Sequence, residues 1–115
     1  MTQKDARQEY ISLNEFFGVS AEDQPMAIHC DTPEKARTLL KLFASHGERW
    51  AGGQSYLDPE EVNWETHEET TCYSNGNKYG SQRWYKKNGY QIYEYERVLD
   101  VPENSMFIFL DYKKG

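Results

Sequence analysis

The sequence predicts a small α+β domain, in which one main amphipathic helix and a short N-terminal helix pack on a mostly antiparallel sheet of about four to six strands. The first observation behind this prediction is a short apolar run followed at once by a capped segment with helical periodicity. The second is a pair of Asn-Gly dipeptides, which mark tight turns next to β-prone segments. The third is another apolar run near the C-terminus, of the length of a buried strand.

Residues 1–25 are predicted to form a polar N-terminal extension that contains one short helix. Ser12 and Glu15 have the S-x-x-E spacing of a capping box, in which the two side chains accept hydrogen bonds from free backbone N–H groups. The apolar residues that follow Ser12 give this helix one ring-bearing face, which ends at Gly18. We therefore expect the helix to dock on a core formed by residues 26–112.

The main strand and the main helix follow each other directly. Residues 26–30 form a short apolar run of strand length. Thr32 is a natural N-cap, and Pro33 occupies the first helical position, where its missing N–H has no intrahelical partner to lose. Gly47 stands where a left-handed residue is expected to end the helix. The predicted apolar face of this helix consists of Ala36, Leu39, Leu40, Phe43 and Ala44.

Residues 50–57 are predicted to form the next strand, because the segment is rich in aromatic residues and glycine. The glycines at 52–53 are expected to mark a bulge or a close approach of the backbone. The Asp-Pro pair at 58–59 ends this strand. Residues 62–64 fit either a short strand or one turn of helix.

The C-terminal half of the chain is predicted to be rich in strands. Residues 70–73 and 78–84 are expected to form a hairpin around the Asn-Gly pair at 75–76. The second Asn-Gly pair precedes residues 90–98, which alternate in the manner of a strand with tyrosines on both faces. Residues 106–110 are a continuous apolar run, which predicts a central buried strand.

Length and composition limit the class of protein. At 115 residues the chain is expected to form a single domain over residues 1–115. Aromatic residues make up 15% of the sequence, so the core and any binding surface are predicted to depend on rings. Neither a membrane-spanning apolar stretch nor an apolar leader is evident, so we expect a cytoplasmic location and no membrane contact. Cys30 and Cys72 are expected to be free thiols there.

The charge of the chain indicates a basic partner. The net charge of −6 disfavours proteins that bind nucleic acid by neutralising phosphates, so we expect no direct DNA binding. Between Leu57 and Thr70 there are six acids and no lysine or arginine, which fits either a solvated loop or a recognition surface. The residues predicted to contact a partner are Asp58, Glu60, Glu61, Trp64, Glu65, Glu68 and Glu69. The protein itself is expected to be a monomer or a small homo-oligomer.

The sequence contains no glycine loop for phosphate, no nucleophile elbow and no H-E-x-x-H motif, and we predict that the protein is not an enzyme. A Cys–His nucleophile pair needs an electropositive environment that holds a thiolate, and neither Cys30 nor Cys72 has one nearby in the sequence. The paired glutamates of the acidic stretch diverge on an extended chain and are expected to be exposed, which does not suit acid–base catalysis.

A small zinc protein is one alternative. His29, Cys30, His67 and Cys72 supply the residue types and the number of ligands that a tetrahedral zinc site uses. His29 and Cys30 are adjacent, however, so on a strand their side chains point to opposite faces and cannot both bind one ion without a kink. We therefore expect no cofactor, with zinc as the weaker alternative.

A module that sequesters a nucleotide signal is the other alternative. In such a module, tyrosines and tryptophans would stack on the base, and a cation would bind the phosphate. The candidate cations are Lys78, Arg83, Lys86 and Lys87. Trp64 and Trp84 stand among charged residues and fit either a lid over the core or a binding surface, whereas Trp50, directly after the main helix, is expected in the core.

Several short segments occur together between residues 26 and 96. They are Ile28-His29-Cys30, Gly47, Trp50-Ala51-Gly52-Gly53, Asn63-Trp64, Thr71-Cys72-Tyr73, Tyr79-Gly80 and the run from Tyr85 to Ile92. In this combination the chain resembles a family of small uncharacterised proteins carried by phages and prophages of Gram-positive bacteria. The resemblance implies a genomic setting and no reaction.

Small acidic phage proteins of this size are often accessory factors that bind and disable a host machine, and anti-CRISPR proteins are the best-known group of that kind. The resemblance therefore implies an inhibitor in the host cytoplasm that docks on a basic surface of a host defence factor, such as a CRISPR effector nuclease. The acidic stretch and its nearby aromatic residues would form the contact.

Overall fold

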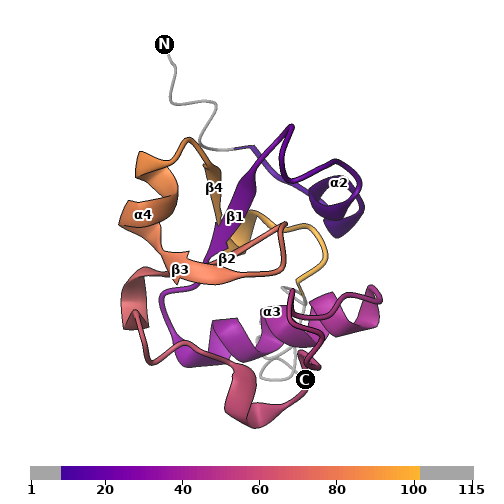
Figure 1. The fold of residues 1–115 in the computed structure, drawn as a ribbon, viewed down its shortest axis with the longest axis vertical. Coiled ribbons are helices and arrows are strands. Elements are labelled where there is room, and N and C mark those ends of the chain that lie inside the picture. The colour runs from indigo at the N-terminus through magenta and orange to yellow at the C-terminus, as the bar shows by residue number, and fades with distance from the viewer. Residues whose placement is uncertain (1–8, 102–115) are drawn as a thin grey trace, which may run out of the picture.

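Strand β1 (Met26–His29) is formed by the first apolar run of the chain and lies inside the sheet. The computed structural model of the protein describes residues 9–101. β1 pairs antiparallel with β2 (Thr71–Ser74) on one edge and parallel with β4 (Gln91–Glu94) on the other. β3 (Tyr79–Ser81) pairs antiparallel with β2, which gives the order β3-β2-β1-β4 (Figure 1). The predicted α+β class with a mostly antiparallel sheet is confirmed.

The main helix α3 (Pro33–Ser45) begins and ends where the sequence predicts. The Thr32 hydroxyl accepts a hydrogen bond from the Lys35 backbone N–H at 3.1 Å, so one of the free N–H groups of the first turn is satisfied. After the helix, Gly47 has a φ of 89°, a left-handed conformation that glycine adopts without steric cost. The buried face consists of Ala36, Leu39, Leu40 and Phe43.

The short helix α2 (Leu13–Phe17) docks on the core, as predicted, with Leu13 and Phe16 buried. Its capping box is formed in both directions: the Glu15 N–H donates to the Ser12 hydroxyl at 3.1 Å, and the Ser12 N–H donates to the Glu15 carboxylate at 3.0 Å. The Phe16 ring is fully buried and stacks on Phe43, with 5.9 Å between the ring centroids. The helix therefore extends the core beyond the edge of α3.

The two faces of the sheet are covered by different helices. Ile28 and Tyr73 face the main core beneath α2 and α3. Ala27 and Cys72 face the other way, against Tyr85 of the short helix α4 (Gln82–Lys87). Figure 1 shows α3 and α4 on opposite sides of the strands. Neighbouring residues of β1 thus face opposite sides of the sheet, and both sides are buried. For this reason the sequence of β1 is a continuous apolar run.

The predicted strand at residues 50–57 is wrong. Trp50 begins a turn instead: its N–H donates to the Gln54 carbonyl at 3.0 Å, and its carbonyl accepts from the Gly53 N–H at 2.7 Å. The Trp50 and Tyr56 rings pack against each other with 4.7 Å between their centroids. Ring burial, rather than strand pairing, thus accounts for the aromatic content of this segment.

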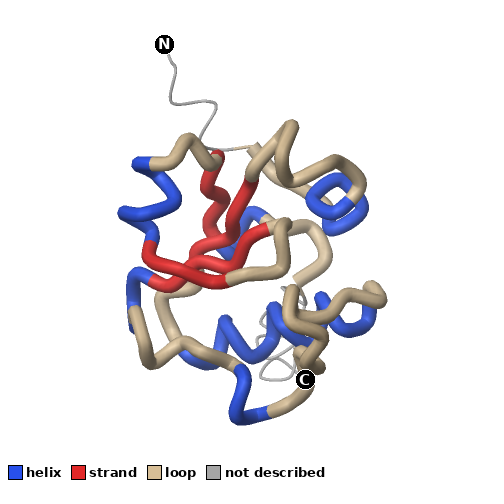
Figure 2. The backbone as a smooth tube through the Cα atoms, viewed as in Figure 1, coloured by secondary structure: helices blue, strands red, loops and turns tan. Residues whose placement is uncertain are grey.

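The long connection between α3 and β2 is mostly loop, interrupted by two short helical turns (Figure 2). The first is η1 (Pro59–Glu61), which Asp58 caps by accepting a hydrogen bond from the Glu60 N–H at 2.9 Å. The second is η2 (Glu68–Thr70), which leads directly into β2. Residues 62–64, for which the sequence left strand and helix open, lie in the loop between the two turns.

The predicted hairpin forms, but its second strand is shorter than expected. The Ser74 N–H donates to the Lys78 carbonyl at 2.8 Å, and Asn77 takes the left-handed φ of 63° that closes the turn. β3 then ends at Ser81, whose hydroxyl accepts from the Trp84 N–H at 3.1 Å and caps α4. Residues 82–84 are therefore helical, because the Ser81 side chain caps the first turn of α4. The strand predicted for these three residues is wrong.

The second Asn-Gly pair ends a helix rather than forming a hairpin turn. Gly89 has a φ of 83° directly after α4, which is the left-handed position typical of a helix C-terminus. The predicted strand over residues 90–98 is reduced to β4, and the chain continues as η3 (Tyr95–Arg97). The predicted strand at residues 106–110 lies outside the described residues.

Among residues 9–101, no helix combines the length and the apolar character needed to cross a membrane. The segment after η3 returns to the N-terminal part of the chain. Ile11 pairs with Val98 in a parallel bridge, and the Leu13 N–H donates to the Asp100 carboxylate at 2.8 Å. These contacts join the two ends of the described chain beside α2.

Replacing Phe43 by alanine should destabilise the fold by about 3–5 kcal/mol, because the ring is fully buried and its loss leaves a cavity under α3. Urea unfolding followed by circular dichroism measures the change. Lys41→Ala, on the exposed face of the same helix, is the matched control and should stay within about 0.5 kcal/mol of the parent protein. Equal effects of the two substitutions would contradict the packing of α3.

Candidate functional site

The acidic segment, residues 58–69, presents unpaired carboxylates to solvent. Five of its six acids are exposed, and Glu61 is half-buried. The ion pairs found among residues 9–101 use other carboxylates, namely those of Asp31, Glu34, Glu48, Glu94 and Glu96. The acidic segment thus keeps its negative charge available, which is the property that the sequence predicted for a contact surface.

The backbone of the acidic segment is tied to the centre of the sheet. The Trp64 indole N–H donates to the Cys30 carbonyl at 3.0 Å. The Thr71 hydroxyl donates to the Glu68 carbonyl, at 2.7 Å, and lies 3.0 Å from the Trp64 carbonyl. The Glu68 N–H donates to the same Trp64 carbonyl. Trp64 is half-buried and packs against the main core, so it anchors the segment more than it displays a contact ring.

His29 links β1, β4 and the acidic segment. Its Nδ1 lies 2.7 Å from the Glu94 carboxylate, and its Nε2 lies 2.7 Å from the Glu69 carbonyl oxygen. The hydrogen bond to Glu94 is the largest influence on the His29 pKa and raises it above the ordinary histidine value, against the opposing effect of partial burial. Both ring nitrogens therefore contact oxygen atoms of other segments and help to hold β1, β4 and the acidic segment together.

The four residues of the zinc alternative do not come together. Cys30 faces the main core, whereas Cys72 lies on the opposite face of the sheet against Tyr85. His29 has both ring nitrogens occupied, and His67 lies against the Tyr79 ring at 6.0 Å between centroids. Within the described chain, no three His, Cys, Asp or Glu side chains are grouped so that they could hold a metal ion.

Both cysteines are buried thiols. Burial raises the pKa of Cys30 well above its usual range and raises that of Cys72 to about 12. A thiol in this environment stays protonated at neutral pH, and the thiolate is the reactive form. The structure therefore gives neither cysteine the environment of a catalytic nucleophile.

A second surface, the aromatic hollow, lies beside β3 and α4. It is a concavity of about 450 Å³ formed by His67, Lys78, Tyr79, Trp84, Tyr85 and Tyr90, together with Gly80 and Ser81. Tyr85 forms the inner wall and is almost fully buried, whereas 52% of Trp84 is exposed. The Tyr85 and Tyr90 ring centroids are 4.6 Å apart, and the Trp84 and Tyr85 rings meet edge to face at 5.2 Å. The rings thus support each other around an open space.

Three of the four cations that the sequence singled out lie around this hollow. Lys78 lines the aromatic hollow itself. Arg83 and Lys86 line an adjoining concavity of about 540 Å³, and Ser81 belongs to both. All of these cations, and Lys87, are exposed, and within the described chain none of them forms an ion pair. They remain free to bind an anion.

A third concavity, of about 590 Å³, adjoins the aromatic hollow along His67, Lys78 and Tyr79. Trp50 lines it, and the Trp50 indole N–H is buried without a hydrogen-bond partner among residues 9–101. Glu61 also lines this third concavity, so the concavity extends from the aromatic hollow to the acidic segment. The two candidate surfaces are neighbours.

Comparisons with known proteins found no family model, no curated protein and no solved structure that matches the chain. The candidate function therefore depends on the acidic segment and the aromatic hollow themselves.

Replacing Glu94 by glutamine should lower the His29 pKa, because the carboxylate is the main group that stabilises the imidazolium. A raised folded-state pKa stabilises the fold below the unfolded histidine pKa of about 6.5, and this contribution is lost as the pH rises through the folded value. The stability difference between the parent protein and Glu94→Gln should therefore be largest below about pH 6.5 and should shrink as the pH rises through the folded-state pKa of His29. NMR titration of the His29 ring and urea unfolding measure both effects.

Glu96→Gln is the matched control, because Glu96 pairs with Lys35 instead of His29. It should leave the His29 titration unchanged. An identical His29 midpoint in the parent protein and in Glu94→Gln would show that the hydrogen bond between them does not form in solution.

Proposed function

We propose that the protein is a non-catalytic interaction protein whose acidic segment binds a basic surface of another protein. The observation that carries this proposal is the set of unpaired, solvent-facing carboxylates on a backbone anchored to β1 and β2. A negatively charged surface that is already ordered loses little conformational entropy on binding, so its electrostatic attraction to a basic partner is retained as affinity.

The partner that fits this surface best is a nucleic-acid-binding protein. Grooves that hold nucleic acid are lined with lysine and arginine, which neutralise phosphates. A row of carboxylates held at fixed positions competes for the same cations. The resemblance to phage proteins supports the narrower proposal of an inhibitor that docks on a host defence nuclease, in the manner of anti-CRISPR proteins.

Charge reversal of Glu60, Glu61, Glu68 and Glu69 to lysine should abolish inhibition by placing like charges against the basic groove. The fold should persist, because Glu60, Glu68 and Glu69 are exposed, Glu61 is only half-buried, and within the described residues none of the four forms an ion pair. Plasmid interference by a CRISPR effector nuclease, with and without the protein, measures inhibition, and circular dichroism measures folding.

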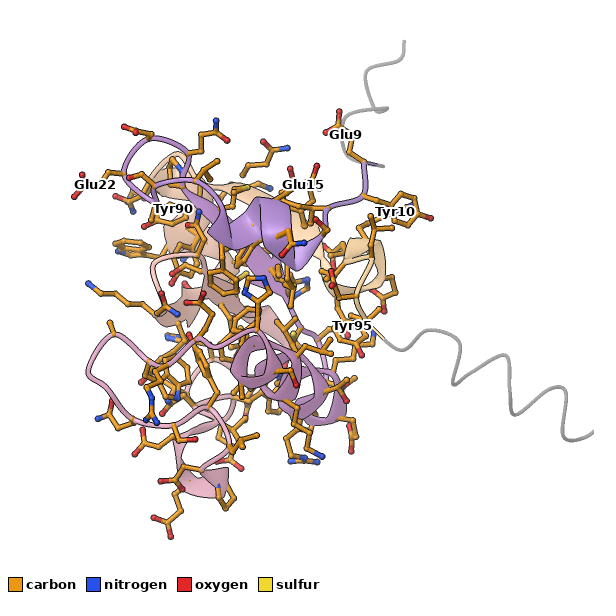
Figure 3. All side chains as sticks on the ribbon, turned by 90° about the vertical axis from the view of Figure 1, so that its right-hand side faces the viewer. Glu9, Tyr10, Glu15, Glu22, Tyr90 and Tyr95 are labelled. Atoms are coloured by element: carbon orange, nitrogen blue, oxygen red, sulfur yellow. The ribbon has the colours of Figure 1, made fainter. Side chains whose placement is uncertain are left out.

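A second fourfold reversal, of Glu9, Glu22, Asp23 and Glu34, is the matched control, since it changes the net charge by the same amount. Glu9 and Glu22 lie at the top of Figure 3, whereas η1 of the acidic segment lies at the bottom of the molecule in Figure 1, which shares its vertical axis. The control should retain inhibition. Full activity of the first variant, or equal loss in both, would overturn the acidic segment as the contact surface.

A further inference from the structure

We infer that the aromatic hollow is a binding site for a mononucleotide, that is, a planar heteroaromatic ring that carries phosphate. This inference goes beyond the proposed function, because it concerns a different surface and a different class of ligand. The volume of the aromatic hollow, about 450 Å³, falls within the range of concavities that bind small molecules.

The walls of the hollow suit a flat ring. Tyr79 comes from β3, Trp84 and Tyr85 from α4, and Tyr90 from the segment that leads into β4. Trp84 touches Tyr85 and Tyr90, yet half of it is exposed, so it offers apolar surface on which a base can stack. A nucleobase that covered Trp84 would remove the largest exposed ring around the hollow from water.

The charges around the hollow select an anion. In a chain with 19 acids, the residues that line the aromatic hollow and the 540 Å³ concavity on its Ser81 side include three cations and no carboxylate. The 590 Å³ concavity on the Tyr79 side is lined by one carboxylate, that of Glu61. Lys78 lies in the wall, and Arg83 and Lys86 lie next to it across Ser81. Lys78 would oppose a cationic ligand such as a methylated ammonium, whereas it can bind a phosphate while the ring stacks on Trp84.

The site is held in place by contacts that do not involve the ligand. The Ser81 hydroxyl caps α4 and so positions Trp84 and Tyr85. Gly80 passes so close to Tyr85 that a Cβ atom there would lie 3.2 Å from the ring. The walls are thus ordered before a ligand arrives, which limits the entropy lost on binding.

The neighbouring acidic segment favours a mononucleotide over a nucleic acid strand. His67 belongs both to the hollow and to the acidic segment, and it is followed directly by Glu68 and Glu69. A single nucleotide needs only the hollow and its cations. A longer strand would have to place further phosphates along these carboxylates, which repel them.

The experiment is a titration of the full-length protein with AMP, GMP, UMP and ATP, followed by tryptophan fluorescence and by ¹H–¹⁵N NMR. At least one nucleotide should bind saturably in the micromolar to low millimolar range, with amide shifts centred on residues 78–90. Adenosine and inorganic phosphate, each of which has only one half of the recognised chemistry, should bind about tenfold more weakly or worse.

Trp84→Ala and Lys78→Ala should each weaken binding about tenfold or more, and Trp84→Phe, which keeps a stacking ring, should recover most of the loss. Because Trp84 and Lys78 are exposed, both variants should keep the NMR spectrum of a folded protein. Lys41→Ala on α3 is the control and should bind as the parent protein does.

Absence of saturable binding to every nucleotide would overturn the inference. So would unchanged affinity in both Trp84→Ala and Lys78→Ala, or binding confined to a single-stranded oligonucleotide. The acidic segment is intact in these variants, so loss of nucleotide binding with retained nuclease inhibition would separate the two sites.

Discussion

Strand β1 is paired along both edges and covered on both faces, and this constraint places the other described elements. β2 and β4 hydrogen-bond to its two edges in opposite senses. Ala27 and Ile28, which point to opposite faces, are both fully buried. One face must therefore be covered by α3 and the other by α4, and a sheet of short strands acquires a core on each side.

Both candidate surfaces derive their order from this arrangement. The acidic segment is attached to the end of β1 through the Trp64 indole and to the start of β2 through the Thr71 hydroxyl. The aromatic hollow exists because α4 packs Tyr85 onto Ala27 and Cys72. The charges and rings of both surfaces are thus displayed on backbone that the core holds in place.

The parts of the fold that sequence predicts are those with local causes. Thr32 and Ser12 cap their helices with atoms three residues away, so the pattern alone locates them. The segment after Trp50 was misread because its rings serve packing across the chain, which periodicity does not reveal. The acids of the site were predicted to be exposed, which holds for five of the six and is wrong for Glu61, which is half-buried. The anchoring role of Trp64 could not be predicted, because it depends on Cys30, 34 residues away.

Hydrogen exchange in NMR tests most directly whether the acidic segment is anchored to β1 and unfolds only together with it. The Cys30 amide, bonded to the Thr71 carbonyl at 2.9 Å, and the Trp64 indole N–H should exchange only through global unfolding. Both should then give the free energy measured by urea unfolding, while the Trp84 indole N–H exchanges rapidly. Exchange of the Trp64 indole N–H at the rate of the Trp84 indole N–H would show that the acidic segment is not anchored to β1.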